Sequence, residues 1–190
     1  MTKDEILATV LSIADRENDA ELTIQLPNFI KIVDSYLNRK LNTSHQEIRT
    51  VLKMTTDNYY AFPEELLSIE SCYIVSATGT ETECKFISNS KQVLADYQYS
   101  IVANSIKINT IADSSISLIY RRGFSLEIEN FVSKLYPDLY IFGLLAEVYG
   151  FLKNDKLSLL YYKRLETILQ EIQRSDVVRK TAQTILTTRD

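Results

Sequence analysis

The chain has 190 residues, of which 45% are hydrophobic, and it carries a formal net charge of −4 with an isoelectric point near 5.2. This length and apolar content allow a sizeable core, so the simplest organisation is one domain with an insertion. No third of the chain has an excess of basic residues, which excludes a protein whose main purpose is to grip nucleic acid through a basic face.

The first block, residues 1–47, has the period of helices. Its N-terminus lacks the charged-then-apolar pattern of a signal peptide, which predicts a chain made and kept in the cytoplasm. A short amphipathic helix starts near Asp4 and ends in a polar run at residues 15–19. A second helix is predicted from about Gln25 to Leu41, because apolar residues recur at helical spacing: Leu26, Phe29, Ile30, Val33, Leu37 and Leu41.

The second block, residues 48–123, changes to the period of strands. Strands are predicted at residues 69–75, 83–87, 99–102, 105–109 and 115–120, and a short helix at 89–97. Clear alternation in the last two strands is typical of a sheet with one face in water. Turn residues at 103–104 and 112–114 favour an antiparallel meander over a crossover repeat.

The two cysteines, Cys72 and Cys84, lie in two of these predicted strands. A loop of even length at residues 77–80 would place Cys72 opposite Lys85, with the thiols on opposite faces, whereas a loop of odd length would align them. A disulfide is not expected in a reducing compartment. The spacing of the cysteines and one distant histidine do not make a zinc pattern.

The third block, residues 124–175, returns to the period of helices. Pro137 suits a first helical position and Asp138 complements the positive end of the helix dipole, so a helix is predicted to start there. Residues 139–152 are apolar around the whole axis, which predicts a central, buried helix. Asp138, Glu147 and Lys153 cut the apolar run below the roughly 20 residues of a membrane span, so none is expected.

Small residues recur along this helix at Gly143, Ala146 and Gly150. Their spacing predicts one ridge on which a neighbouring backbone could approach closely. A glycine inside a helix costs about 1 kcal/mol relative to alanine, and close packing is the expected compensation.

A last helix is predicted from Asp155 to Arg174, with Asn154 or Asp155 as its N-cap. Residues 176–190 lack a sustained period and are predicted to form a flexible C-terminal tail. Its apolar and basic residues suit a segment that becomes ordered on the surface of a partner: Val177, Val178, Arg179, Lys180, Ile185, Leu186 and Arg189.

The sequence contains few residue patterns that could support catalysis. The single histidine, His45, lies in a polar linker, and adjacent Glu64 and Glu65 are better explained as charges at a helix N-terminus than as an acid–base pair. Four glycines build no phosphate-binding loop. We therefore expect no enzyme, no cofactor and no metal site.

The order of several motifs resembles the head-to-tail adaptor (connector) proteins of short-tailed bacteriophages, of the tail tubular protein A type. The segment Tyr136-Pro137-Asp138-Leu139-Tyr140 is the sharpest of these motifs. The others are Leu26-Pro27-Asn28-Phe29-Ile30, Phe62-Pro63-Glu64-Glu65-Leu66, Leu118-Ile119-Tyr120-Arg121-Arg122 and Tyr161-Tyr162. Asn104 departs from the pattern, since a glycine is usual in that hairpin.

The resemblance implies a virion structural protein at the tail or neck, which forms a ring of twelve subunits between portal protein and tail nozzle. Tail fibres are further partners, and genomic DNA passes through the ring without specific binding. The implied fold is α+β: a helical bundle of residues 1–47 and 124–175, an inserted antiparallel β-sheet of residues 48–123, and an extended C-terminal tail.

Two other functions stay open. The first is an intracellular scaffolding module that binds a partner helix through the ridge of Gly143, Ala146 and Gly150. The second, less favoured, is a hydrolase that uses Glu64, Glu65 or Asp138. Electron micrographs of the protein mixed with portal would distinguish the scaffolding module from the adaptor. Hydrolysis assays would test the hydrolase.

Overall fold

A computed structural model describes residues 1–56, 58–88, 94–109 and 115–187. It contains helices and two β-sheets, so the predicted α+β class is confirmed. The chain divides into two compact units. One consists of Met1–His45 and Phe124–Asp190, and the other is Gln46–Gly123.

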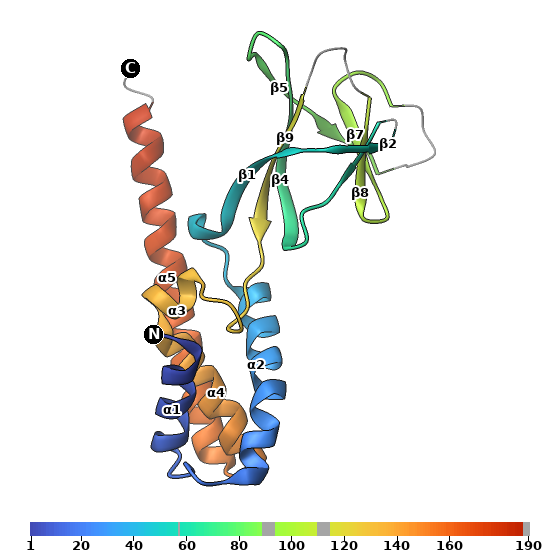
Figure 1. Cartoon of the computed structure of the whole chain (residues 1–190). Coiled ribbons are helices and arrows are strands. Elements are labelled where there is room, and N and C mark those ends of the chain that lie inside the picture. Colours follow the sequence, from blue (N-terminus) through green and yellow to red (C-terminus); the bar gives the residue numbers. More distant parts are fainter. Residues whose placement is uncertain (57, 89–93, 110–114, 188–190) are drawn as a thin grey trace. The chain divides into compact units, whose positions relative to one another are not determined.

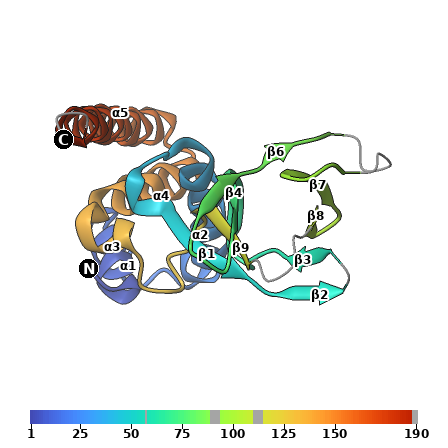
Figure 2. The ribbon, with the colours of Figure 1, turned by 90° about the horizontal axis from the view of Figure 1, so that it is seen from above.

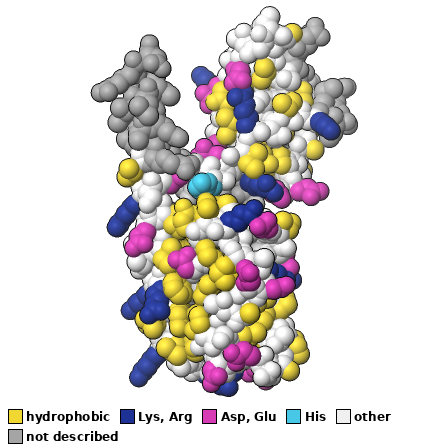
Figure 3. Space-filling model, turned by 60° about the vertical axis from the view of Figure 1, so that its left-hand side comes forward, with side chains coloured by type: hydrophobic (Ala, Val, Ile, Leu, Met, Phe, Trp, Pro, Cys, Tyr) yellow, Lys and Arg dark blue, Asp and Glu magenta, His cyan; other side chains and the backbone are white. Residues whose placement is uncertain are grey.

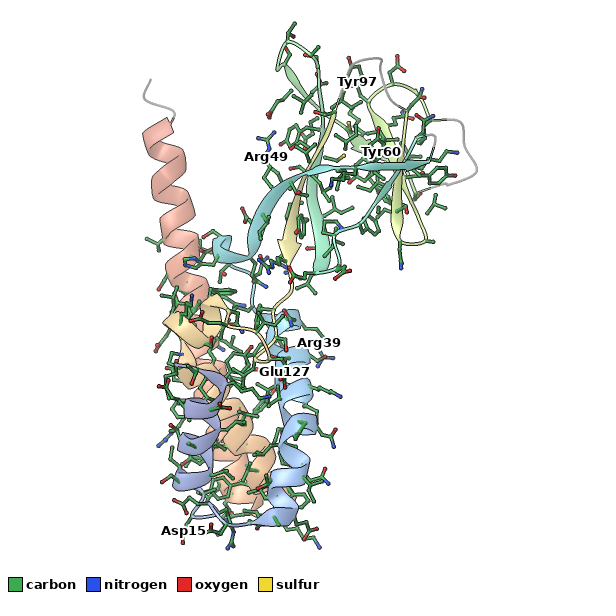
Figure 4. All side chains as sticks on the ribbon, in the orientation of Figure 1. Asp15, Arg39, Arg49, Tyr60, Tyr97 and Glu127 are labelled. Carbon is green, nitrogen blue, oxygen red and sulfur yellow. The ribbon has the colours of Figure 1, made fainter. Side chains whose placement is uncertain are left out.

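The helical unit contains α1 (Lys3–Ile13), α2 (Ala20–Lys40), α3 (Phe131–Leu135), α4 (Pro137–Phe151) and α5 (Asp155–Thr187), shown in Figure 1. Thr2 and Glu5 form a capping box on α1, which satisfies two backbone N–H groups. Asp15, labelled in Figure 4, lies in the turn between α1 and α2. Helix α2 begins earlier than predicted, because the Asp19 side chain accepts a hydrogen bond of 3.0 Å from the Leu22 N–H and caps it.

Helix α4 is the centre of this unit. It begins at Pro137, as predicted, and it contacts each of the other four helices. Tyr140 and four apolar side chains of α4 are fully buried: Leu139, Leu144, Leu145 and Val148. They pack with buried residues of α1, α2 and α5 in one core, as expected for a helix that is apolar on every side.

The β unit contains two sheets. The first has the order β1 (Glu47–Leu52), β9 (Ser115–Arg122), β4 (Leu66–Val75), β5 (Glu81–Glu83). The second has the order β2 (Met54–Thr56), β3 (Tyr59–Ala61), β8 (Ser105–Ile108), β7 (Gln98–Val102), β6 (Lys85–Phe86), and its strands lie in this sequence in Figure 2. One core joins the two sheets; it includes Tyr60, labelled in Figure 4.

The strand connections differ from the predicted meander. Strand β9 pairs with β1 and β4, and β6 pairs in parallel with β7. Two hairpins agree with the sequence: β7 and β8 pair around Ala103, which adopts a positive φ of 51°, and β4 and β5 pair around the loop that contains residues 77–80. Glu64 and Glu65 lie in a turn before β4, not at the start of a helix. Of the helix predicted at 89–97, residues 94–97 are not helical and the rest lie outside the described residues, as does the predicted turn at 112–114.

The cysteine register also differs from the even-loop prediction. Val75 pairs with Glu81, so the loop between β4 and β5 holds residues 76–80, an odd number. Tyr73 is opposite Glu83, and Cys72 is therefore opposite Cys84 rather than Lys85.

Helix α5 continues to Thr187, whereas the sequence predicted a helix that ends at Arg174 and a tail from residue 176. Val177 and Val178 of this segment are exposed, and an exposed helical turn needs no apolar stripe.

Candidate functional site

The three small residues of α4 lie in different environments. A Cβ built on buried Gly143 would lie only 2.8 Å from Cγ1 of Val33, so a side chain of α2 packs directly against the α4 backbone. The carbonyl of buried Ala146 accepts a hydrogen bond of 2.9 Å from the Ser158 hydroxyl of α5. Gly150 is exposed, and a Cβ there would make an ordinary contact of 3.6 Å with Ser158. The three residues thus do not form one ridge toward one neighbour.

An open hollow of about 420 Å³ lies between α2, α4 and α5. Apolar and aromatic side chains dominate its lining, together with two carboxylates: Phe29, Ala146, Glu147, Gly150, Phe151, Asp155, Ser158, Leu159 and Tyr162. Burial raises the pKa of Glu147. Leu159 and Tyr162 are exposed at the rim. Figure 3 shows further hydrophobic side chains gathered on one face of the helical unit, a surface character typical of protein–protein contacts.

Two contacts hold α5 against the end of α2. The Gln173 amide donates a hydrogen bond of 2.6 Å to the Lys40 carbonyl. The Asp176 carboxylate accepts hydrogen bonds from the Ser44 hydroxyl at 2.7 Å and from the Ser44 N–H at 3.1 Å. Asp176 is only 8% exposed. These contacts explain why the helix passes Arg174, because Gln173 and Asp176, on either side of it, gain tertiary partners that the local sequence does not reveal.

The two residues that follow Asp176 have exposed side chains. Val177 and Val178 are 63% and 68% exposed, so two neighbouring apolar side chains are available for contact with a partner. The backbone of Arg179, Lys180, Ile185 and Leu186 is helical, but their side chains lie outside the described part of the structure. Arg189 lies outside the described residues. The exposed valine pair is therefore the part of the predicted docking segment that the structure describes.

A buried carboxylate, Asp34, joins three parts of the helical unit. Its oxygens accept hydrogen bonds from the Tyr140 hydroxyl of α4 at 2.8 Å, the Ser125 hydroxyl at 2.7 Å and the Leu126 N–H at 3.1 Å. Burial raises the pKa of Asp34, although these three hydrogen bonds act in the opposite direction. Sequence analysis missed this cluster, because Ser125 and Tyr140 are 91 and 106 residues away.

Tyr140→Phe is expected to lower the free energy of unfolding by about 1–3 kcal/mol at pH 7, because it removes one donor from a buried carboxylate. Urea denaturation of the two proteins measures this difference. Tyr149→Phe is the matched control, since the Tyr149 hydroxyl makes an exposed bond of 3.3 Å to the Ile13 carbonyl, and it should cost less than about 1 kcal/mol. Equal losses for the two variants would contradict the role of the buried carboxylate.

The same cluster predicts a pH dependence. Since the folded pKa of Asp34 is raised, the folded protein binds its proton more tightly than the unfolded protein does. This contribution to stability is fully present below the unfolded pKa and is lost as pH rises through the folded pKa. The penalty of Tyr140→Phe should accordingly shrink as the pH is lowered and Asp34 becomes neutral.

The candidate catalytic residues are dispersed. His45 is exposed, as Figure 3 shows, and its ring stacks on Phe131 with centroids 5.6 Å apart. Glu65 accepts a hydrogen bond of 2.9 Å from Arg122 within the β unit, whereas Asp138 lies in the first turn of α4. Among the described residues, no three His, Cys, Asp or Glu side chains gather as a metal site would require. The described helices also include none long and apolar enough to span a bilayer.

Comparison of the sequence with models of protein families found a match to one family. The model of the SU10 adaptor protein family matches residues 1–187, through both units and the whole of α5. The search of curated proteins found no match.

Proposed function

Because the chain belongs to the SU10 adaptor protein family of phage head-to-tail adaptors, we propose that it forms a ring, of twelve subunits, between the portal and the tail nozzle. Membership implies a place at the neck or tail of the virion and contacts with portal and tail components. The ring completes the head and extends the channel for genomic DNA, and tail fibres are further partners. The protein is structural and not an enzyme.

The exposed pair of Val177 and Val178 on α5 is the observation that supports this proposal most directly. Asp176 anchors the helix to Ser44, and the next two residues, Val177 and Val178, present apolar surface on a preformed helix. A preformed helix loses less conformational entropy on docking than a disordered segment does. In a ring, many copies of a weak contact act together, because the first contact raises the effective concentration of the others.

The scaffolding alternative is less well supported. It needs the small-residue ridge of α4 to be available to a partner helix, but Val33 of α2 already covers Gly143, and Ala146 is buried. Only exposed Gly150 and the adjoining hollow remain for such a partner.

Electron microscopy of the full-length chain mixed with the portal protein of the same phage tests the proposed function. Class averages should show an additional ring at the narrow end of the portal, with a symmetry that gives the number of subunits. Portal alone is the control. Portal particles that remain bare at a large excess of this protein would rule out the adaptor position, whatever the oligomeric state of the free protein.

We predict weak, non-specific binding of duplex DNA by the isolated protein. The net charge is −4 and bases do not outnumber acids in any third of the chain, which disfavours binding driven by counterion release. A channel that held phosphates tightly would also retard the passing genome. Fluorescence anisotropy at near-physiological salt measures the affinity. A dissociation constant below about 1 μM that weakens steeply with added salt would contradict this prediction, since such behaviour marks extensive phosphate contact.

A further inference from the structure

The two thiols of the β unit lie side by side across a strand pair. Cys72 is in β4 and fully buried, and Cys84 is 6% exposed between β5 and β6. The pairs Tyr73–Glu83 and Ile74–Thr82 continue to Cys72 opposite Cys84. The Cys84 N–H donates a hydrogen bond of 2.8 Å to the Cys72 carbonyl, and the two thiols are close enough to shift each other's pKa.

This placement suits a disulfide without a change of register. Directly opposite residues in an antiparallel pair have Cα atoms about 4.5–5.5 Å apart. Disulfides bridge Cα atoms about 4.4–6.8 Å apart. Both side chains also lie on the same face, because opposite residues of paired strands share a face.

The pair occupies the junction of the two sheets. Cys84 is the single residue between β5, at the edge of the first sheet, and β6, at the edge of the second. All three residues of β5 are exposed, so local opening of this edge strand gives small reagents access to the thiols. The hydrogen bond from the Cys72 thiol lowers the pKa of Cys84, and a thiolate is the form that attacks a disulfide.

We propose that Cys72 and Cys84 form an intramolecular disulfide by thiol–disulfide exchange with a low-molecular-weight disulfide such as oxidised glutathione, and that this bond locks the junction of the two sheets. The Cys84 thiolate attacks one sulfur of the reagent, and a mixed disulfide forms as the first glutathione thiolate leaves. Cys72 then loses its proton and attacks the Cys84 sulfur, which releases the second glutathione. Two cysteine thiols are oxidised and one glutathione disulfide is reduced to two thiols. The inference depends on the β unit alone and is independent of the adaptor function.

The test treats the full-length native chain with oxidised glutathione and follows thiols and mass. Titration in denaturant should show both thiols lost, intact mass should fall by two hydrogens, and a non-reducing digest should contain the peptides of Cys72 and Cys84 linked. Reduction should restore both thiols. Two free thiols in the treated native protein, or cross-linked dimers in place of the internal bond, would overturn the proposal.

Variants separate the two steps. Cys72→Ser should stop at a mixed disulfide, with the mass of one glutathione added at Cys84, while Cys84→Ser should react much more slowly, because Cys72 is fully buried. Far-ultraviolet circular dichroism checks that both variants are folded. In the parent, the bond should raise the melting temperature of the β unit by about 5 °C or more, since it closes a loop in the unfolded chain. An unchanged or lower melting temperature of the oxidised protein would show that the bond does not lock the junction.

Discussion

Removal of residues 177–190 is expected to abolish co-purification with portal rings and to leave the melting temperature within about 2 °C of the parent value. The truncated chain keeps Asp176 and its hydrogen bonds to Ser44, so the helical core retains its last described anchor. It loses the exposed Val177 and Val178, which contribute little to the core of the free protein. Affinity capture on tagged portal and differential scanning calorimetry give the two readouts.

A matched pair of surface variants sharpens this prediction. Val177→Asp combined with Val178→Asp should weaken portal binding strongly, because charges would replace the apolar contact. Ile24→Asp on α2, where the side chain is 73% exposed, should leave portal binding unchanged. If the truncated protein still occupies portal rings like the parent, the docking surface lies elsewhere on the chain, and the adaptor proposal would stand without the tail.

Gly143→Leu is expected to lower the free energy of unfolding by about 3 kcal/mol or more, several times the effect of helix propensity. A Cβ added at this position would lie only 2.8 Å from Cγ1 of Val33. Valine cannot turn away easily, because β-branched side chains have one strongly preferred rotamer in a helix. The larger leucine must therefore push α2 away from α4 at the centre of the core. Urea denaturation measures the change.

Two controls isolate this contact. Gly150→Ala should be neutral or stabilise by up to about 1 kcal/mol, because it improves helix propensity at an exposed position. In a double-mutant cycle, Val33→Ala should offset part of the cost of Gly143→Ala, since it removes the two methyl groups nearest to the new Cβ. A Gly143→Leu variant that melts at or above the parent temperature would refute the close packing of α2 on α4.

Local signals in the sequence predicted the class of the fold and the start of its central helix. Pro137 and Asp138 mark the first turn of α4 because proline and an acidic residue satisfy requirements of that turn itself. Alternation at residues 105–108 and 115–120 identified β8 and β9, since the side-chain period of a strand is a local property. The family resemblance also depended on such local segments and their order, and the match over residues 1–187 confirms it.

Tertiary structure decided the features that depend on partners distant in sequence. Gly143 and Gly150 share a helical spacing, yet one meets Val33 of α2 and the other lies in the open. In the sequence Asp34 resembles any polar residue on a helix, and only the folded structure brings Ser125 and Tyr140 to it.

The loop at residues 76–80 set the cysteine register, because one additional residue in a hairpin loop moves every following side chain to the opposite face. Helix α5 likewise passes Arg174 because Ser44, far away in the chain, satisfies Asp176. Such contacts form only after the chain has closed long loops, so no window of local sequence contains the information that specifies them.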